Sequence, residues 1–90
     1  MSEPKWRVLI SQRAKRMLRR LPKPLKQRLA QTFDDLAHNP RPQGCKKLSG
    51  GDQLYRVRVG DWRVIYAIED EQLIILIITL GPRQDVYRNL

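Results

Sequence analysis

Two kinds of hydrophobic pattern divide this chain of 90 residues. Between residues 11 and 38, apolar side chains recur every three or four positions, which is the spacing of one face of an α-helix. Between residues 54 and 66, apolar and polar side chains alternate, as they do along a strand with one buried face. The pattern therefore predicts helices in the first half of the chain and strands in the second half.

Two consecutive helices are predicted. Ser11 has a side chain suited to cap the first, and Pro22-Lys23-Pro24 ends it and begins the second, since proline fits a first helical turn but not an interior. The second helix ends near residues 38–40, and so short a connection predicts an antiparallel helix pair. The apolar stripe of the first helix is Ala14, Met17, Leu18 and Leu21. The stripe of the second is Leu25, Leu29, Phe33, Leu36 and Ala37.

Four strands are predicted, at residues 5–10, 54–59, 62–68 and 72–79, with a loop over residues 39–53. The last strand is a continuous apolar run, which indicates an interior strand with both faces largely buried. The order β-α-α-β-β-β predicts an α+β fold in which the helical hairpin packs on one face of a small, mainly antiparallel sheet. At this length, residues 1–90 are expected to form one domain.

The Gly60-Asp61 turn fixes the register of the central hairpin. With a two-residue turn, Arg58 lies opposite Arg63, and side chains alternate between the two faces. The core face is predicted to hold Tyr55, Val57, Val59, Trp62, Val64 and Tyr66. The other face, here called the arginine face, is predicted to hold Arg56, Arg58, Arg63 and Ile65.

The arginine face has two interpretations, a solvated outer surface or a phosphate-binding site. Like charges paired across strands destabilise a sheet by about 0.2–1 kcal/mol. Three arginines without an acidic neighbour on that face of the hairpin favour the phosphate site, because the guanidinium fork suits bidentate phosphate contacts. Further basic candidates for phosphate contact are Lys46, Lys47 and Arg88.

Composition adds a strong positive charge to this picture. The net charge is +9 and residues 1–28 carry ten Lys or Arg, which indicates a polyanionic partner: nucleic acid, an acidic protein or an anionic membrane. The longest apolar run, Leu73 to Leu80, is far shorter than the ~20 residues that span a bilayer. With no signal pattern and a lone cysteine, Cys45, we expect a cytoplasmic protein without a disulfide or a multi-cysteine zinc site.

Two segments resemble a known family. The segment LYRVRVGDWRVIY from Leu54 to Tyr66 and the ending GPRQDVYR from Gly81 to Arg88 are similar to the RelE/ParE superfamily of bacterial toxins. The Arg-x-x-x-Tyr ending favours its RelE-type mRNA interferases, and the likeness covers nearly the whole chain. It implies the toxin of a type II toxin–antitoxin system, bound to a cognate antitoxin protein in a hetero-oligomer.

The resemblance also implies an activity. Such toxins are endoribonucleases that cut mRNA in the ribosomal A site, where a 2′-hydroxyl attacks the adjacent phosphate without a metal or cofactor. The partners implied are therefore mRNA and ribosomal RNA, with no membrane. By position, Arg63 would hold the phosphate and stabilise the transition state, Arg83 would lie at the leaving 5′-oxygen, and Tyr87 would be the general base.

Several alternatives stay open at this point. Tyr87 acts as a base only if nearby cations lower its pKa by ~3 units from about 10; otherwise it is a stacking platform for a nucleobase. Pro82 stands where many relatives have His or Lys, and no Glu–His pair is found. The competing functions are a ParE-like toxin that poisons DNA gyrase without catalysis, and a basic RNA-binding module without activity.

Overall fold

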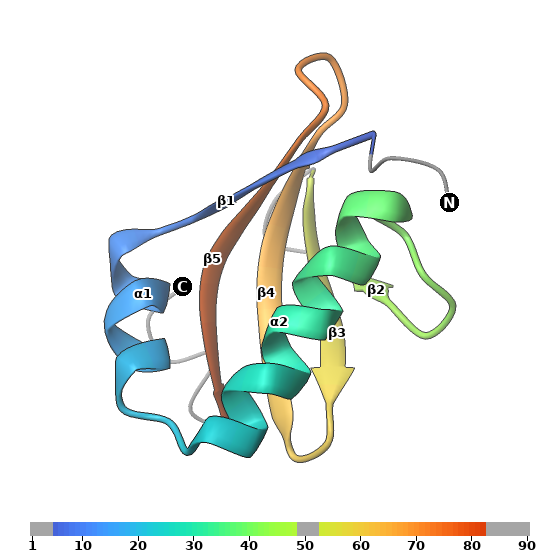
Figure 1. Cartoon of the computed structure of the whole chain (residues 1–90). Helices are drawn as coiled ribbons and strands as arrows, with labels where there is room; N and C mark the ends of the chain where they lie inside the picture. The colour runs from blue at the N-terminus through green and yellow to red at the C-terminus, as the bar shows by residue number, and fades with distance from the viewer. Residues whose placement is uncertain (1–4, 49–52, 83–90) are drawn as a thin grey trace.

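The structure, a computed structural model, describes residues 5–48 and 53–82. In this part of the chain, two helices lie on one face of a five-stranded sheet (Figure 1). The helices are α1 (Gln12–Arg19) and α2 (Lys23–His38). The strands are β1 (Arg7–Ile10), β2 (Lys46–Lys47), β3 (Leu54–Val59), β4 (Trp62–Glu69) and β5 (Ile74–Pro82). The predicted α+β fold is confirmed, and none of the helices in the described ranges is long and apolar enough to cross a membrane.

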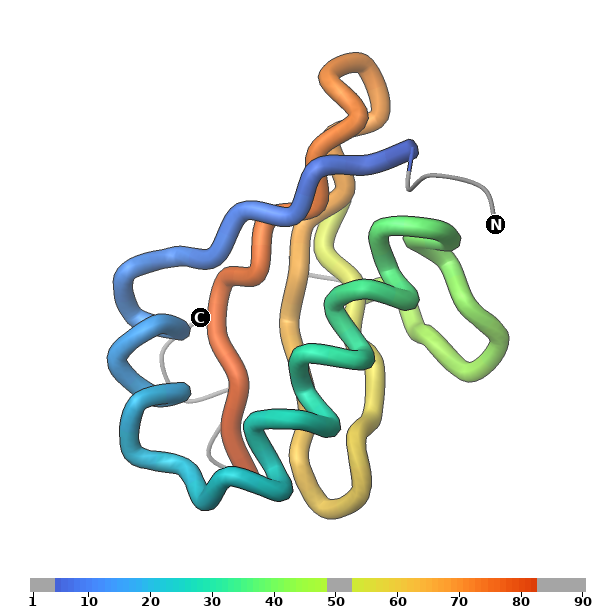
Figure 2. Tube along the Cα trace, in the orientation of Figure 1, coloured from blue at the N-terminus to red at the C-terminus, as the bar shows by residue number. Residues whose placement is uncertain are grey.

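The strands are ordered β1-β5-β4-β3-β2 across the sheet. β1 pairs parallel with β5, and the other pairs are antiparallel. Figure 2 shows how the chain passes from β1 at one edge, through both helices, to β2 at the other edge, before β3, β4 and β5 fill the sheet between them. β5 therefore lies in the interior of the sheet, as its continuous apolar run predicts.

The loop predicted over residues 39–53 is wrong in one respect, because it contains β2. This strand has two residues, and it pairs antiparallel with β3 so that Lys46 lies beside Arg56 and Lys47 beside Tyr55. Two residues are too few to show a period in the sequence. The strand exists because β3 offers it a free edge, which is a tertiary effect.

Ser11 joins α1 to the sheet. Its hydroxyl oxygen accepts a hydrogen bond from the Ala14 N–H (3.1 Å), which confirms it as the N-cap of α1. The same hydroxyl donates to the Ile78 carbonyl oxygen at 2.6 Å. α1 is thereby held alongside β5, whereas α2 crosses the sheet at an angle, so the two helices diverge from their short connection (Figure 1).

β5 contains a bulge that the sequence pattern hides. Ile65 pairs with Thr79 and Tyr66 pairs with Ile77, so Ile78 has no partner of its own on β4. The extra residue shifts the alternation of side chains, as bulges do. Ile77 and Leu80, which are three residues apart, consequently both face the helices.

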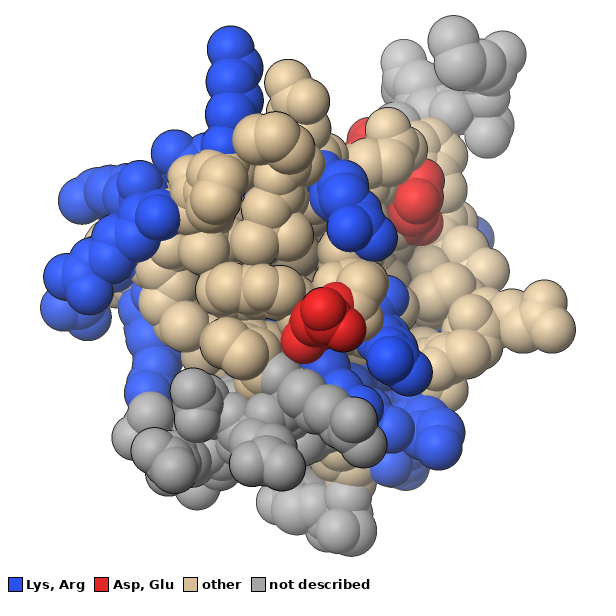
Figure 3. Space-filling model, turned by 90° about the horizontal axis from the view of Figure 1, so that it is seen from below, with Lys and Arg blue, Asp and Glu red and all other residues tan. Residues whose placement is uncertain are grey.

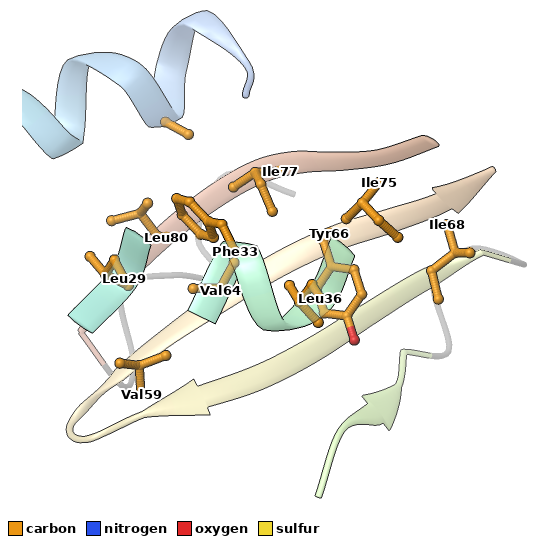
Figure 4. Close-up of a cluster of buried hydrophobic side chains, with 11 residues drawn as sticks. Leu29, Phe33, Leu36, Val59, Val64, Tyr66, Ile68, Ile75, Ile77 and Leu80 are labelled. Carbon is orange, nitrogen blue, oxygen red and sulfur yellow. The ribbon is translucent and has the colours of Figure 1, made fainter. Parts of the chain in front are cut away.

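The hydrophobic core lies between α2 and the central strands. Figure 4 shows Leu29, Phe33 and Leu36 of α2 against side chains of β4 and β5, among them Tyr66 and Ile77. Leu29, Tyr66 and Ile77 have no exposed area, and burying one such side chain contributes roughly 1.5–3 kcal/mol. The predicted stripe of the second helix is confirmed, with Leu25 partly rather than fully buried.

Candidate nucleic-acid interface

The β3–β4 hairpin has the predicted register. Arg58 pairs with Arg63, Arg56 pairs with Ile65, and Val57 pairs with Val64. The predicted core side chains belong to the helix-covered cluster, so Arg56, Arg58 and Arg63 lie together on the opposite side of the sheet. The strand pairing of the hairpin therefore places the three arginines on one face.

The arginines of this face differ in exposure. Arg58 is exposed and donates from its Nε to the Gly60 carbonyl oxygen (3.1 Å), whereas Arg56 and Arg63 are half-buried. Ile65, on the same face, has no exposed area. This face is therefore not uniformly open to water.

Lys46 joins the arginine face through β2. It is the pairing partner of Arg56, so its side chain leaves the sheet on the same side. Lys47 pairs with Tyr55 and is directed to the other side. Of the two lysines expected to contact phosphate, the structure brings Lys46 to the arginines and directs Lys47 away from them.

Acidic side chains lie toward the ends of this face. Asp61 is exposed in the hairpin turn. Glu69 is on the same side of β4 as Arg63, but six residues further along, about 20 Å away at ~3.3 Å per residue. Within residues 5–48 and 53–82, these two carboxylates lie at the turn and at the far end of β4, and Arg58 and Arg63 pair between them.

The hairpin turn meets a cation from α2. Gly60 has φ of 61°, and a Cβ atom built there would lie 3.2 Å from the guanidinium nitrogens of Arg28. A side chain at this position would be strained by the backbone, and its Cβ would make a tight contact with the end of the Arg28 side chain. The sequence analysis did not identify Arg28, because no local pattern shows that the first turns of α2 lie beside the β3–β4 turn.

A second group of contacts fixes the connection between α2 and β2. The Tyr66 hydroxyl donates to the Pro40 carbonyl oxygen at 2.8 Å, and burial raises the pKa of Tyr66. The Arg41 guanidinium lies 5.3 Å from the centre of the Tyr55 ring and 3.0 Å from the Asp70 carboxylate, and that hydrogen bond raises the pKa of Arg41. These contacts hold the segment that leads into β2, and hence Lys46.

The tail residues Arg83, Tyr87 and Arg88 lie outside the described residues. They follow directly after β5 in the sequence. At the end of β5, Gly81 pairs with Arg63 and Pro82 pairs with Trp62. The chain therefore leaves the described part of the sheet beside the predicted transition-state arginine.

The one histidine of the chain lies on the helix side of the sheet, away from the arginine face. His38 is in the last turn of α2, where its Nδ1–H donates to the Asp34 carbonyl oxygen (2.9 Å). Among the residues that the structure describes, no group of three or more His, Cys, Asp or Glu side chains could hold a metal ion.

Two helices on one face of a five-stranded sheet, with a basic β3–β4 hairpin, are the fold of small RelE-like toxins. The RelE–RelB complex of Pyrococcus horikoshii contains a chain that matches with a TM-score of 0.81 at 34% identity, over 91% of this chain and 99% of that one. The intact RelBE complex of Escherichia coli has a chain of the same fold, with a TM-score of 0.76 at 22% identity over 86% of this chain and 95% of that one.

Sequence comparison gives the family. Residues 8–87 match the model described as the ParE toxin of type II toxin–antitoxin systems, and the chain belongs to that family. It is 33% identical to the putative toxin RelE1 of Methanocaldococcus jannaschii, over 94% of this chain and 98% of that protein. It is also 33% identical to the toxin RelE of Mycobacterium tuberculosis, over 92% and 87%. The protein is a RelE-like toxin of a type II toxin–antitoxin system.

Proposed function

We propose that this toxin is an endoribonuclease that binds mRNA on the ribosome at the arginine face and cuts it there. The observation that carries the proposal is the direct pairing of Arg58 with Arg63 across the hairpin, with Lys46 beside Arg56. Two guanidinium groups on adjacent strands can contact one phosphate together, each through its planar fork.

The reaction that fits this site needs no metal. A ribose 2′-hydroxyl attacks the adjacent phosphorus, the P–O5′ bond breaks, and the products carry a 2′,3′-cyclic phosphate and a 5′-hydroxyl. Arg63 stabilises the negative charge that develops on the phosphate, which is the largest contribution in most reactions of this kind. Arg56, Arg58 and Lys46 hold the neighbouring phosphates.

The tail supplies the remaining groups of the proposed mechanism. Arg83 stabilises the leaving 5′-oxygen by its charge, because a guanidinium does not release its proton in the accessible pH range, and the 5′-oxygen takes its proton from water. Tyr87 accepts the 2′-hydroxyl proton if the arginines lower its pKa sufficiently, and otherwise stacks on a base. Arg88 contributes a further phosphate contact.

We further propose a protein antitoxin of the RelB type as the partner of this toxin. Relatives of this fold were solved as RelE–RelB complexes, including those of P. horikoshii, M. tuberculosis and Methanococcus jannaschii. An antitoxin that covers the arginine face would block access of RNA to it, and a partner of net negative charge suits a chain of net charge +9.

Translation of a defined mRNA with the toxin, followed by primer extension, tests the proposal. We expect cuts that follow the reading frame, and we expect them to vanish in Arg63→Ala, Arg83→Ala and Tyr87→Phe. Near-full cutting by Tyr87→Phe alone would assign Tyr87 to stacking. Intact mRNA together with stalled DNA gyrase would instead establish the second candidate, a gyrase-binding toxin. This candidate is tested because the matching family model is described as the ParE toxin.

A further inference from the structure

We propose that the hollow between α1 and the start of β4 is a second RNA site, which takes an unpaired nucleotide. The hollow has a volume of ≈ 450 Å³. It is lined by Arg13, Arg16, Met17, Arg20, Leu21 and Trp62. The lining thus consists of three arginines and three apolar side chains, one of which is an aromatic ring.

The arginines of the hollow form one row on α1. Arg13, Arg16 and Arg20 follow each other at spacings of three and four residues, which places them on one side of the helix over about 10 Å. All three are exposed. Within residues 5–48 and 53–82 the one ion pair joins Arg41 to Asp70, so no described carboxylate neutralises this row.

Trp62 gives the hollow its affinity for a base. It is half-buried, packs against the core from the helix side of the sheet, and also lines the hollow. An aromatic ring beside arginines is the combination with which proteins bind unpaired nucleotides: the ring stacks on the base and the guanidinium groups contact phosphate. An acidic peptide would use the arginines but gain nothing specific from the ring, so the nucleotide is the better fit.

The position of the hollow connects it to the arginine face. Trp62 and Arg63 are consecutive on β4, so their side chains leave opposite sides of the sheet at the same end of the molecule. Figure 3 views this end and shows Lys and Arg on both sides, over the α1 side at the left and over the β2–β3 side at the right. Arg28 lies at the hairpin turn between them. An RNA strand passing around this end would contact both sites.

Fluorescence can test the site directly, because the chain has two tryptophans. In a Trp6→Phe variant, Trp62 is the remaining fluorophore. The probe is a 2′-O-methylated oligoadenylate, which lacks the attacking hydroxyl and stays intact. We expect it to quench Trp62 fluorescence, and Arg13→Ala or Arg16→Ala in the same background to weaken binding at least fivefold. Each should also reduce the log–log salt slope by ~0.7.

The matched control is Arg19→Ala, which removes an exposed arginine of α1 that does not line the hollow. Equal weakening by Arg19→Ala would show general attraction to a basic helix and overturn the site, as would binding without quenching. Equal affinity for oligoglutamate would assign the hollow to an acidic protein instead. The site does not depend on the proposed cleavage: quenching retained in Arg63→Ala supports it even if the wild-type toxin cuts no RNA.

Discussion

The two faces of the β3–β4 hairpin share one strand pairing but carry opposite kinds of side chain, apolar on the helix-covered face and basic on the arginine face. On the helix-covered face, Val64 and Tyr66 are fully buried beneath α2. On the arginine face, the same pairing sets Arg58 against Arg63. The register that builds the core therefore also concentrates positive charge on the opposite face of the hairpin.

The contrast is also energetic. Burial on the covered face stabilises the fold, whereas like charges paired across strands, as Arg58 and Arg63 are, cost about 0.2–1 kcal/mol where no other group offsets them. We therefore expect substitutions on the two faces to separate stability from RNA binding, with the larger stability effects on the covered face.

The largest stability effect is expected for Leu29→Ala. Leu29 has no exposed area, so the substitution removes buried methyl groups and leaves a cavity beneath α2. The free energy of unfolding should fall by about 2–5 kcal/mol, measured by urea denaturation. Gln27→Ala, at an exposed position of the same helix, is the control and should stay within ~0.5 kcal/mol of wild type. Equal losses in the two variants would contradict the placement of Leu29 in the hydrophobic core.

An intermediate effect is expected for Tyr66→Phe. The phenyl ring keeps the packing, but the Pro40 carbonyl oxygen loses the hydrogen bond that it accepts at 2.8 Å. The free energy of unfolding should fall by about 1–3 kcal/mol. A loss indistinguishable from zero would mean that water replaces the hydroxyl, and that the contact does not hold the connection to β2.

The same substitution predicts a pH dependence. Burial raises the pKa of Tyr66 in the folded protein above its unfolded value of about 10, and only the protonated hydroxyl can donate to Pro40. Its contribution is therefore complete below about pH 10 and is lost as the pH rises through the folded pKa. Above pH 10, wild-type stability should fall more steeply than that of Tyr66→Phe; parallel curves would refute the assignment.

The smallest effect is expected on the arginine face, in a comparison of Arg58→Gln with Arg58→Lys. Both lose the Nε bond to Gly60, but only Gln removes the charge opposite Arg63. Arg58→Gln should be the more stable by about 0.2–1 kcal/mol at low salt, with the gap closing as salt is added. It should also bind RNA more weakly. Greater stability of the Lys variant would show that the pair does not repel.

Local patterns in the sequence were sufficient for the parts of the fold set by neighbouring residues. The Gly60-Asp61 turn gave the register of the arginine face, and the 3.6-residue period gave the buried side of α2. β2 and the bulge at Ile78 were not predictable, because each depends on a strand elsewhere in the chain. The same holds for Arg41, whose partner Asp70 is 29 residues away. The sequence named Lys46 and Lys47 alike as candidates for phosphate contact, and only the pairing of β2 with β3 places Lys46 on the arginine face and Lys47 on the other side.

The central claim is that the arginine face binds the phosphate at which mRNA is cut. Its most direct test is the single-turnover rate of mRNA cleavage on programmed ribosomes for wild type, Arg63→Ala, and Arg7→Ala, whose exposed arginine lies on the edge strand β1. We expect Arg63→Ala to slow cleavage by about 10²–10³-fold, as for loss of one transition-state donor, and Arg7→Ala to leave the rate unchanged. Cleavage by Arg63→Ala at the wild-type rate would contradict the account.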